Sequence, residues 1–179
     1  PDRQDAITRG TLSNDDFDGE MDDASYHIES IEEKGLPVDP INAYNLFAIY
    51  LRWCIEHNLM GEDFLNEYGE VAKQVKADPA SVDLRAFIRD KLNGQIMVPM
   101  FNKVGRAFTS YYYGEPDSPN FPRDIENYAL EYLGPEKYYS DEFQFKAPLF
   151  IPFDEDYYQA MAKVIEERFT NWQGQDFDE

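Results

Sequence analysis

The chain has 179 residues, 42% of them hydrophobic and 16% aromatic, which predicts one folded domain rather than a disordered chain. Its 36 acidic and 16 basic residues give a net charge of −20. That charge disfavours binding to nucleic acid or to a membrane, because phosphates and anionic lipids would be repelled. One cysteine excludes a disulfide framework and a multi-cysteine zinc site, and no apolar run of about 18 residues suggests a membrane span.

Residues 1–23 are polar, rich in aspartate and without apolar periodicity, which predicts an acidic flexible arm. Residues 24–174 are expected to form a single globular helical domain, and residues 175–179 a loose acidic tail. The beginning of the chain does not resemble a signal peptide, so the expected localisation is cytoplasmic.

The clearest element is a helix predicted over Ile41–Met60, ending at Gly61. Its polar positions Asn45, Arg52 and Glu56 fall on one narrow stripe, and almost every other side chain is apolar. A helix with this pattern is buried on nearly all sides. We therefore expect a mainly α, single-domain fold in which other helices surround this central helix.

Further helices are predicted on both sides of a loop at Gly114–Asn120, from their apolar spacing and their glycine and proline boundaries. They span Glu62–Lys76, Val82–Leu92, Met97–Tyr113, Pro122–Leu133 and a last helix after the capping residue Asp154. Tyr138–Phe153 alternates imperfectly and contains Pro148 and Pro152, which allows a short edge strand or hairpin there.

The acidic arm resembles the start of a calcium-binding loop, in which oxygen ligands alternate along the chain and glycine makes a turn. The residues that would supply the oxygens are Asn14, Asp16, Asp18, Glu20 and Asp22. The final position of such a loop requires a bidentate glutamate, and Ser25 stands there. A solvated acidic arm explains the pattern better than a calcium site, and we expect no cofactor.

Catalytic motifs do not emerge from the sequence. Cys54 and His57 lie one helical turn apart, and His27 is the other histidine, but zinc needs three or four ligands. The same three residues lack the glycine-rich turn of a nucleophile elbow. The carboxylates are too numerous to single out an acid–base pair. A buried thiol and a histidine near a helix end are the simpler interpretation, so an enzyme is not expected.

Consecutive tyrosines next to acidic residues are the strongest sign of a binding surface. A helix cannot bury three adjacent tyrosines on one face, so at least one of Tyr111, Tyr112 and Tyr113 should be exposed, and Tyr138–Tyr139 and Tyr157–Tyr158 repeat this pattern. Exposed aromatic rings anchor protein interfaces, and carboxylates attract a basic partner. The predicted partner-binding residues are Tyr111, Tyr113, Glu115, Asp117, Asp141, Glu142, Asp154, Glu155 and Asp156.

From Asp22 onward the chain resembles a family of small, acidic, largely uncharacterised bacterial proteins associated with polymorphic toxin loci. The residues that carry the resemblance are Asp22–His27, Leu46, Tyr50–Trp53, Asn58-Leu59, Leu84–Ile88, Gly105–Phe108, Tyr111-Tyr112, Tyr158, Val164–Phe169 and Trp172. The resemblance implies a role as an immunity protein, without implying any catalytic residue.

The expected function is therefore a cytoplasmic immunity protein that binds a basic cognate toxin domain and occludes its active or substrate-binding surface. Two alternatives remain open at this point. One is a hydrolase-like enzyme that reverses a modification made by the toxin, and the other is a calcium-binding adaptor protein.

Overall fold

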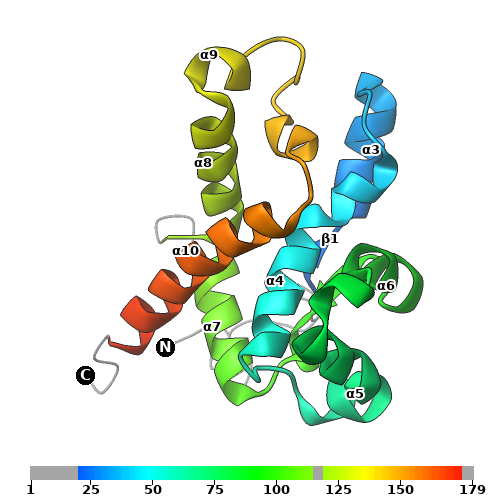
Figure 1. Ribbon diagram of the computed structural model, residues 1–179, viewed down its shortest axis with the longest axis vertical. Helices are drawn as coiled ribbons and strands as arrows, with labels where there is room; N and C mark the ends of the chain where they lie inside the picture. Colours follow the sequence, from blue (N-terminus) through cyan, green and yellow to red (C-terminus); the bar gives the residue numbers. More distant parts are fainter. Residues whose placement is uncertain (1–19, 115–118, 175–179) are drawn as a thin grey trace, which may run out of the picture.

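The computed structural model describes residues 20–114 and 119–174, and its fold is mainly α as the sequence predicts (Figure 1). The elements, with η marking short 3-10 helices, are β1 (Glu20–Asp23), α3 (Ser25–Lys34), η1 (Pro40–Tyr44), α4 (Asn45–Glu56), α5 (Glu62–Ala77), η2 (Pro79–Ser81), α6 (Leu84–Lys91), β2 (Gln95–Met97), η3 (Val98–Met100), α7 (Lys103–Gly114), α8 (Phe121–Leu133), α9 (Pro135–Tyr138), η4 (Ala147–Phe150) and α10 (Glu155–Gln173). Within the described ranges, no helix combines the length and the apolar character needed to cross a bilayer.

Helix α4 lies at the centre, between α5 and α6 on one side and α7 and α10 on the other (Figure 1). All of its residues except Arg52 and Glu56 are buried. Burial on nearly every side follows from the apolar residues on nearly every face of the helix, so the predicted central helix is confirmed. It is shorter than predicted, because η1 replaces its first turn and Asn58 adopts a left-handed conformation (φ 57°) after its end.

Aromatic rings fill the space between α4, α7 and α10. Trp53 of α4 packs against Phe108 of α7 and Phe169 of α10, with ring centroids 5.8 and 5.4 Å apart. Gly105 lets α7 approach the chain that follows α4, because a Cβ at this position would stand 2.4 Å from the carbonyl oxygen of Leu59. The close contact requires glycine, since no larger residue fits without moving backbone atoms.

A buried polar cluster joins α7, α8 and α10. The Tyr112 hydroxyl donates a hydrogen bond of 2.5 Å to the carboxylate of Asp124, which is only 5% exposed. Arg168 donates two hydrogen bonds to the same carboxylate, at 3.0 and 2.9 Å. Since a buried carboxylate is costly unless it is paired and hydrogen-bonded, the three residues stabilise the structure only as a set.

The strand pairing differs from the prediction. Glu20–Asp23, which we assigned to the flexible arm, forms β1 and pairs antiparallel with β2, with Asp23 opposite Gln95. Residues 1–19 and 175–179 lie outside the described residues. The segment Tyr138–Phe153 contains turns and η4 but no strand. Pro148 forms part of η4, where its fixed φ suits a helical turn better than an extended edge.

Candidate functional site

Three stacked tyrosine rings connect the core with the surface where α8 meets α10. The ring of Tyr157, on α10, stacks on Tyr128 of α8 with centroids 4.8 Å apart and 17° between the planes. Tyr128 in turn stacks on Tyr132, at 5.9 Å and 29°. Tyr157 is 2% exposed and Tyr132 is 55% exposed. The stack therefore presents one aromatic ring to solvent and supports it from beneath.

Three exposed carboxylates act electrostatically on the middle ring, Tyr128: Asp154 and Asp156 at the start of α10, and Glu131 on α8. Burial raises the pKa of Tyr128, and the negative charges of Asp154, Asp156 and Glu131 raise it further. The same charges stabilise a cation brought to this surface. We call Tyr128, Glu131, Tyr132, Asp154 and Asp156 the tyrosine–carboxylate patch.

The patch has the chemistry to hold a lysine or arginine side chain of a partner. A cation within about 6 Å of a tyrosine ring is attracted by the negative face of the ring, and nearby carboxylates add to that attraction. The part of the patch on α10 is held in place, because the Asp154 side chain caps this helix by accepting a 2.9 Å hydrogen bond from the backbone N–H of Tyr157.

Sequence reasoning identified Asp154 and Asp156 but missed the three residues that α8 contributes. The signal for those three was present, since Tyr128 and Tyr132 are four residues apart and so lie on one face of a helix. The binding surface was predicted from adjacent tyrosines, whereas stacking along a helix needs a spacing of one turn.

The prediction that at least one tyrosine of each cluster is exposed is wrong for Tyr111–Tyr113 and for Tyr157–Tyr158, and it holds for Tyr138–Tyr139. Tyr112 is buried, and Tyr111 and Tyr113 are half-buried. Tyr111 faces Trp172 of α10, while Tyr113 packs on Tyr50 of α4 at 5.2 Å. Because α7 is packed against several helices, adjacent tyrosines point to different neighbours and all are at least partly covered.

The two tyrosine pairs, Tyr138–Tyr139 and Tyr157–Tyr158, are also mostly covered. Tyr157 and Tyr158 are both buried on α10. Tyr138 is half-buried, and only Tyr139 of these four is exposed, at 63%. Tyr158 is covered because the Arg52 guanidinium lies 3.6 Å above its ring and its hydroxyl donates a hydrogen bond to Glu56.

The remaining predicted carboxylates do not gather at the patch as a group. Asp141 and Glu142 are exposed in the turns after α9. Glu115 and Asp117 lie outside the described residues. Glu155 is occupied by Arg52, which donates hydrogen bonds of 2.8 and 2.9 Å to its two oxygens and holds the pKa of that carboxyl below its usual value.

A groove of about 430 Å³ runs beside this ion pair, between α4, α6 and the start of α10. Its cationic side chains already have partners: Arg52 pairs with Glu155, and Arg85 donates hydrogen bonds to Asn42 and Asn45. The groove is therefore a hollow near the patch whose two arginines already form ion-pair or hydrogen-bond contacts within the protein.

The candidate metal and nucleophile residues lie in separate environments. Cys54 is fully buried, and burial raises its pKa, so it is a thiol at neutral pH and a poor nucleophile. His57 contacts the Trp53 carbonyl at 2.8 Å through Nδ1 and the Glu166 carboxylate at 2.8 Å through Nε2.

In the described part of the chain, no group of three histidine, cysteine or acidic residues is placed to hold a metal ion. Among the calcium-loop candidates, Asn14, Asp16 and Asp18 lie outside the described residues. Glu20 and Asp22 are described only as backbone of β1.

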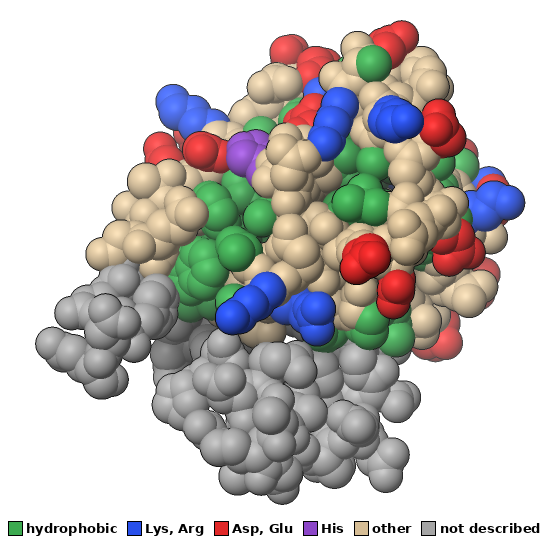
Figure 2. Space-filling view, turned by 90° about the horizontal axis from the view of Figure 1, so that it is seen from below, with side chains coloured by type: hydrophobic (Ala, Val, Ile, Leu, Met, Phe, Trp, Pro, Cys, Tyr) green, Lys and Arg blue, Asp and Glu red, His purple; other side chains and the backbone are tan. Residues whose placement is uncertain are grey.

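Figure 2 views the molecule from below Figure 1 and shows how charge is distributed on that face. Acidic side chains lie at the edges of the described part and also near its middle, interspersed with Lys and Arg, and hydrophobic side chains are exposed between them. Exposed acidic side chains also occur away from the patch, for example Glu70 on α5 and Asp141 after α9, so the feature that distinguishes the patch is its supported aromatic ring.

The described residues define a mainly α-helical protein with a central buried helix and an acidic, tyrosine-bearing surface. The chain belongs to the family described as a domain of unknown function (DUF7832), whose model matches residues 20–141. The match includes the α8 half of the patch and ends before α10. Neither the curated proteins nor the solved structures include a match to the chain.

Proposed function

We propose that this protein is a cytoplasmic immunity protein that binds a basic bacterial toxin domain and blocks it by covering its active or substrate-binding surface. The observation that carries the proposal is the exposed Tyr132 ring, stacked on Tyr128, whose pKa the nearby charges of Asp154, Asp156 and Glu131 raise. A supported aromatic ring serves as an interface anchor at low cost in conformational entropy, because it is ordered before the partner arrives.

The net charge of −20 supports a basic partner. Many toxin domains act on nucleic acid and carry basic surfaces for its phosphates, and an acidic protein can occupy such a surface in their place. Long-range attraction then accelerates the encounter, while contacts at the patch determine how long the complex lasts.

The test is to express the basic domains encoded by the genes next to this protein's own and to measure their binding to the full chain, with kinetics at several salt concentrations. Glu131→Lys should lower the association rate by roughly three- to tenfold at low salt and weaken its salt dependence. Glu70→Lys is the matched control, because Glu70 is exposed on α5, remote from α8 in Figure 1, and makes only a solvent-exposed pair with Lys73.

A second matched pair tests the anchor. Tyr132→Ala should accelerate dissociation by about tenfold or more, whereas Tyr139→Ala, which removes a similarly exposed ring, should have little effect. Equal effects within each pair would refute the patch as the interface. Protection from the toxin at far less than one protein per toxin would refute blocking and favour an enzyme.

A further inference from the structure

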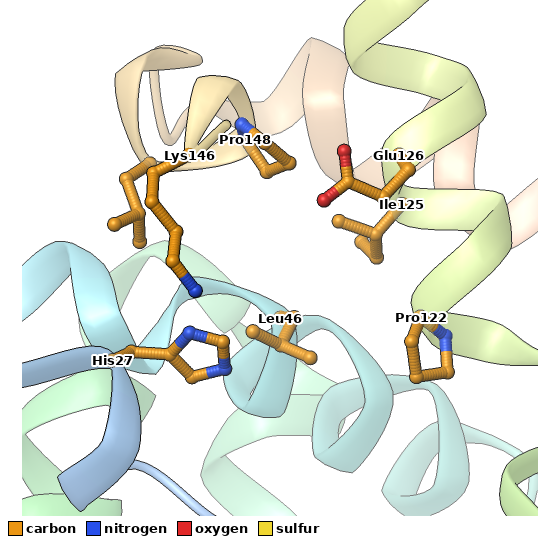
Figure 3. Close-up of a pocket in the computed structure, with 8 residues that line it drawn as sticks. His27, Leu46, Pro122, Ile125, Glu126, Lys146 and Pro148 are labelled. Atoms are coloured by element: carbon orange, nitrogen blue, oxygen red, sulfur yellow. The ribbon is translucent and has the colours of Figure 1, made fainter. Parts of the chain in front are cut away.

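A separate cavity of about 250 Å³ lies between α3, α4, α8 and the segment that leads into η4 (Figure 3). Its walls are mostly apolar and come from Leu46, Pro122, Ile125, Pro148 and Leu149. For comparison, an engineered apolar cavity of about 150 Å³ binds benzene. The cavity is thus large enough for one aromatic ring with a small substituent.

Three polar side chains line this apolar space: His27, Lys146 and Glu126. In Figure 3 the Lys146 amine points toward the His27 ring, and the Glu126 carboxylate points into the cavity from the opposite wall. The cavity therefore has a cationic end and an anionic end. A site of this kind, apolar with a few converging polar groups, is typical of small-molecule binding.

The cationic end has unused hydrogen-bonding capacity. The Nδ1 atom of His27 is buried and has no hydrogen-bond partner among the described residues. Lys146 forms no salt bridge with a described carboxylate, and its amine lies 4.4 Å from the centre of the Tyr26 ring. An oxygen atom placed between His27 and Lys146 would give both groups a partner, which removes the cost of leaving a buried polar atom unpaired.

The charge state of His27 restricts the chemical group of the ligand that can carry this oxygen. Burial and, to a smaller extent, the positive charge of Lys146 together lower the pKa of His27 to about 4. At neutral pH the imidazole is therefore uncharged and can present one N–H donor, while Lys146 supplies one positive charge. A single carboxylate matches this end, since it accepts hydrogen bonds and carries one negative charge.

The opposite wall restricts the rest of the ligand. The Glu126 carboxylate accepts a hydrogen bond from the Tyr138 hydroxyl, so it is held in position. It repels a second carboxylate on the ligand, and it can accept a hydrogen bond from a hydroxyl group.

From this geometry we propose that the cavity binds a small aromatic monocarboxylic acid, with its carboxylate between Lys146 and His27 and its ring against Leu46, Ile125 and Leu149. This site goes beyond the proposed toxin-binding function and does not depend on it. Its ligand is anionic, whereas the tyrosine–carboxylate patch attracts cations.

The test uses the full chain and follows the two histidine rings by NMR during titration. The chain has two histidines, so a His57→Gln variant assigns the His27 signals. The probes are benzoate, its uncharged analogue benzyl alcohol, 4-hydroxybenzoate, and terephthalate, which adds a second carboxylate. Benzoate and 4-hydroxybenzoate should shift the His27 signals with saturation, at least about tenfold more tightly than benzyl alcohol or terephthalate.

Two variants make the result specific. Lys146→Met should weaken benzoate binding by about tenfold or more, and the matched control Lys137→Met, at an exposed lysine of α9, should leave it unchanged. Glu126→Gln should strengthen terephthalate binding relative to benzoate, which a misfolded variant would not do. Absence of saturable shifts, equal binding of benzoate and benzyl alcohol, or an unchanged Lys146→Met variant would overturn the proposal.

Discussion

Acidification should destabilise this protein through one identifiable histidine. His27 has a folded-state pKa of about 4, lowered from 6.5 by burial and by the charge of Lys146. The unfolded chain therefore takes up the proton first as pH falls. The neutral imidazole of His27 therefore contributes stability to the folded protein that is complete above pH 6.5 and is lost progressively as the pH falls to 4. At about 1.36 kcal/mol per pH unit, the contribution across this window is about 3 kcal/mol.

The measurement is urea unfolding of the wild type and of His27→Gln at several pH values from 4 to 7. The chain has 36 carboxylic acids, and they titrate in both proteins, so the difference between the two curves isolates His27. Relative to His27→Gln, the wild type should gain about 3 kcal/mol between pH 4 and pH 7. Lys146→Met should retain part of the effect, because burial continues to lower the pKa after the cation is removed.

Parallel stability curves for the wild type and His27→Gln would refute this reasoning. So would a directly titrated His27 pKa near 6.5 in the folded protein, because no window would then separate the folded and unfolded states. A Lys146→Met variant with an unchanged His27 pKa would refute only the contribution of the lysine.

Two further predictions concern packing. Asp124→Ala should lower the free energy of unfolding by about 3–5 kcal/mol in denaturant titrations, because Arg168 and the Tyr112 hydroxyl lose their shared buried acceptor; a loss below about 1 kcal/mol would contradict the cluster. Gly105→Ala should lower the melting temperature markedly, since the new Cβ would stand 2.4 Å from a carbonyl oxygen, whereas Gly69→Ala on α5, with open space at its Cβ, should be neutral or slightly stabilising. Similar melting curves for the two alanine variants would contradict the close approach of α7.

The central helix was predictable because one local property determined its place. Because α4 is apolar on nearly every face, its side chains leave water only if other elements pack around the whole helix, whichever elements these are. The last helix was predictable for a similar reason, since Asp154 marks its start and the side chain does cap it. Both features depend on residues close together in the sequence.

The strand pair and the patch were not predictable in this way. β1 pairs with β2 across about seventy residues, and nothing in the short, acidic segment Glu20–Asp23 indicates its partner. The patch likewise needs α8 and α10 side by side, and only then do Tyr128 and Tyr157 stack. The predicted exposure of one of Tyr111–Tyr113 is wrong because it depends on how many helices pack around α7, and the sequence of α7 alone does not indicate that number.

The two proposed sites differ in the sign of charge that they select, and the surrounding structure explains how both can occur in one acidic protein. Arg52, Arg89 and Arg168 are each paired with a carboxylate, and the acidic residues in excess of the basic ones leave the net charge of −20 that a distant partner meets. Lys146 lies instead against an aromatic ring and an uncharged imidazole, which leaves its charge available inside an apolar cavity. Benzoate at saturation should therefore leave the association rate of a basic partner nearly unchanged, because the ligand would neutralise the half-buried Lys146 without altering the carboxylates of the patch.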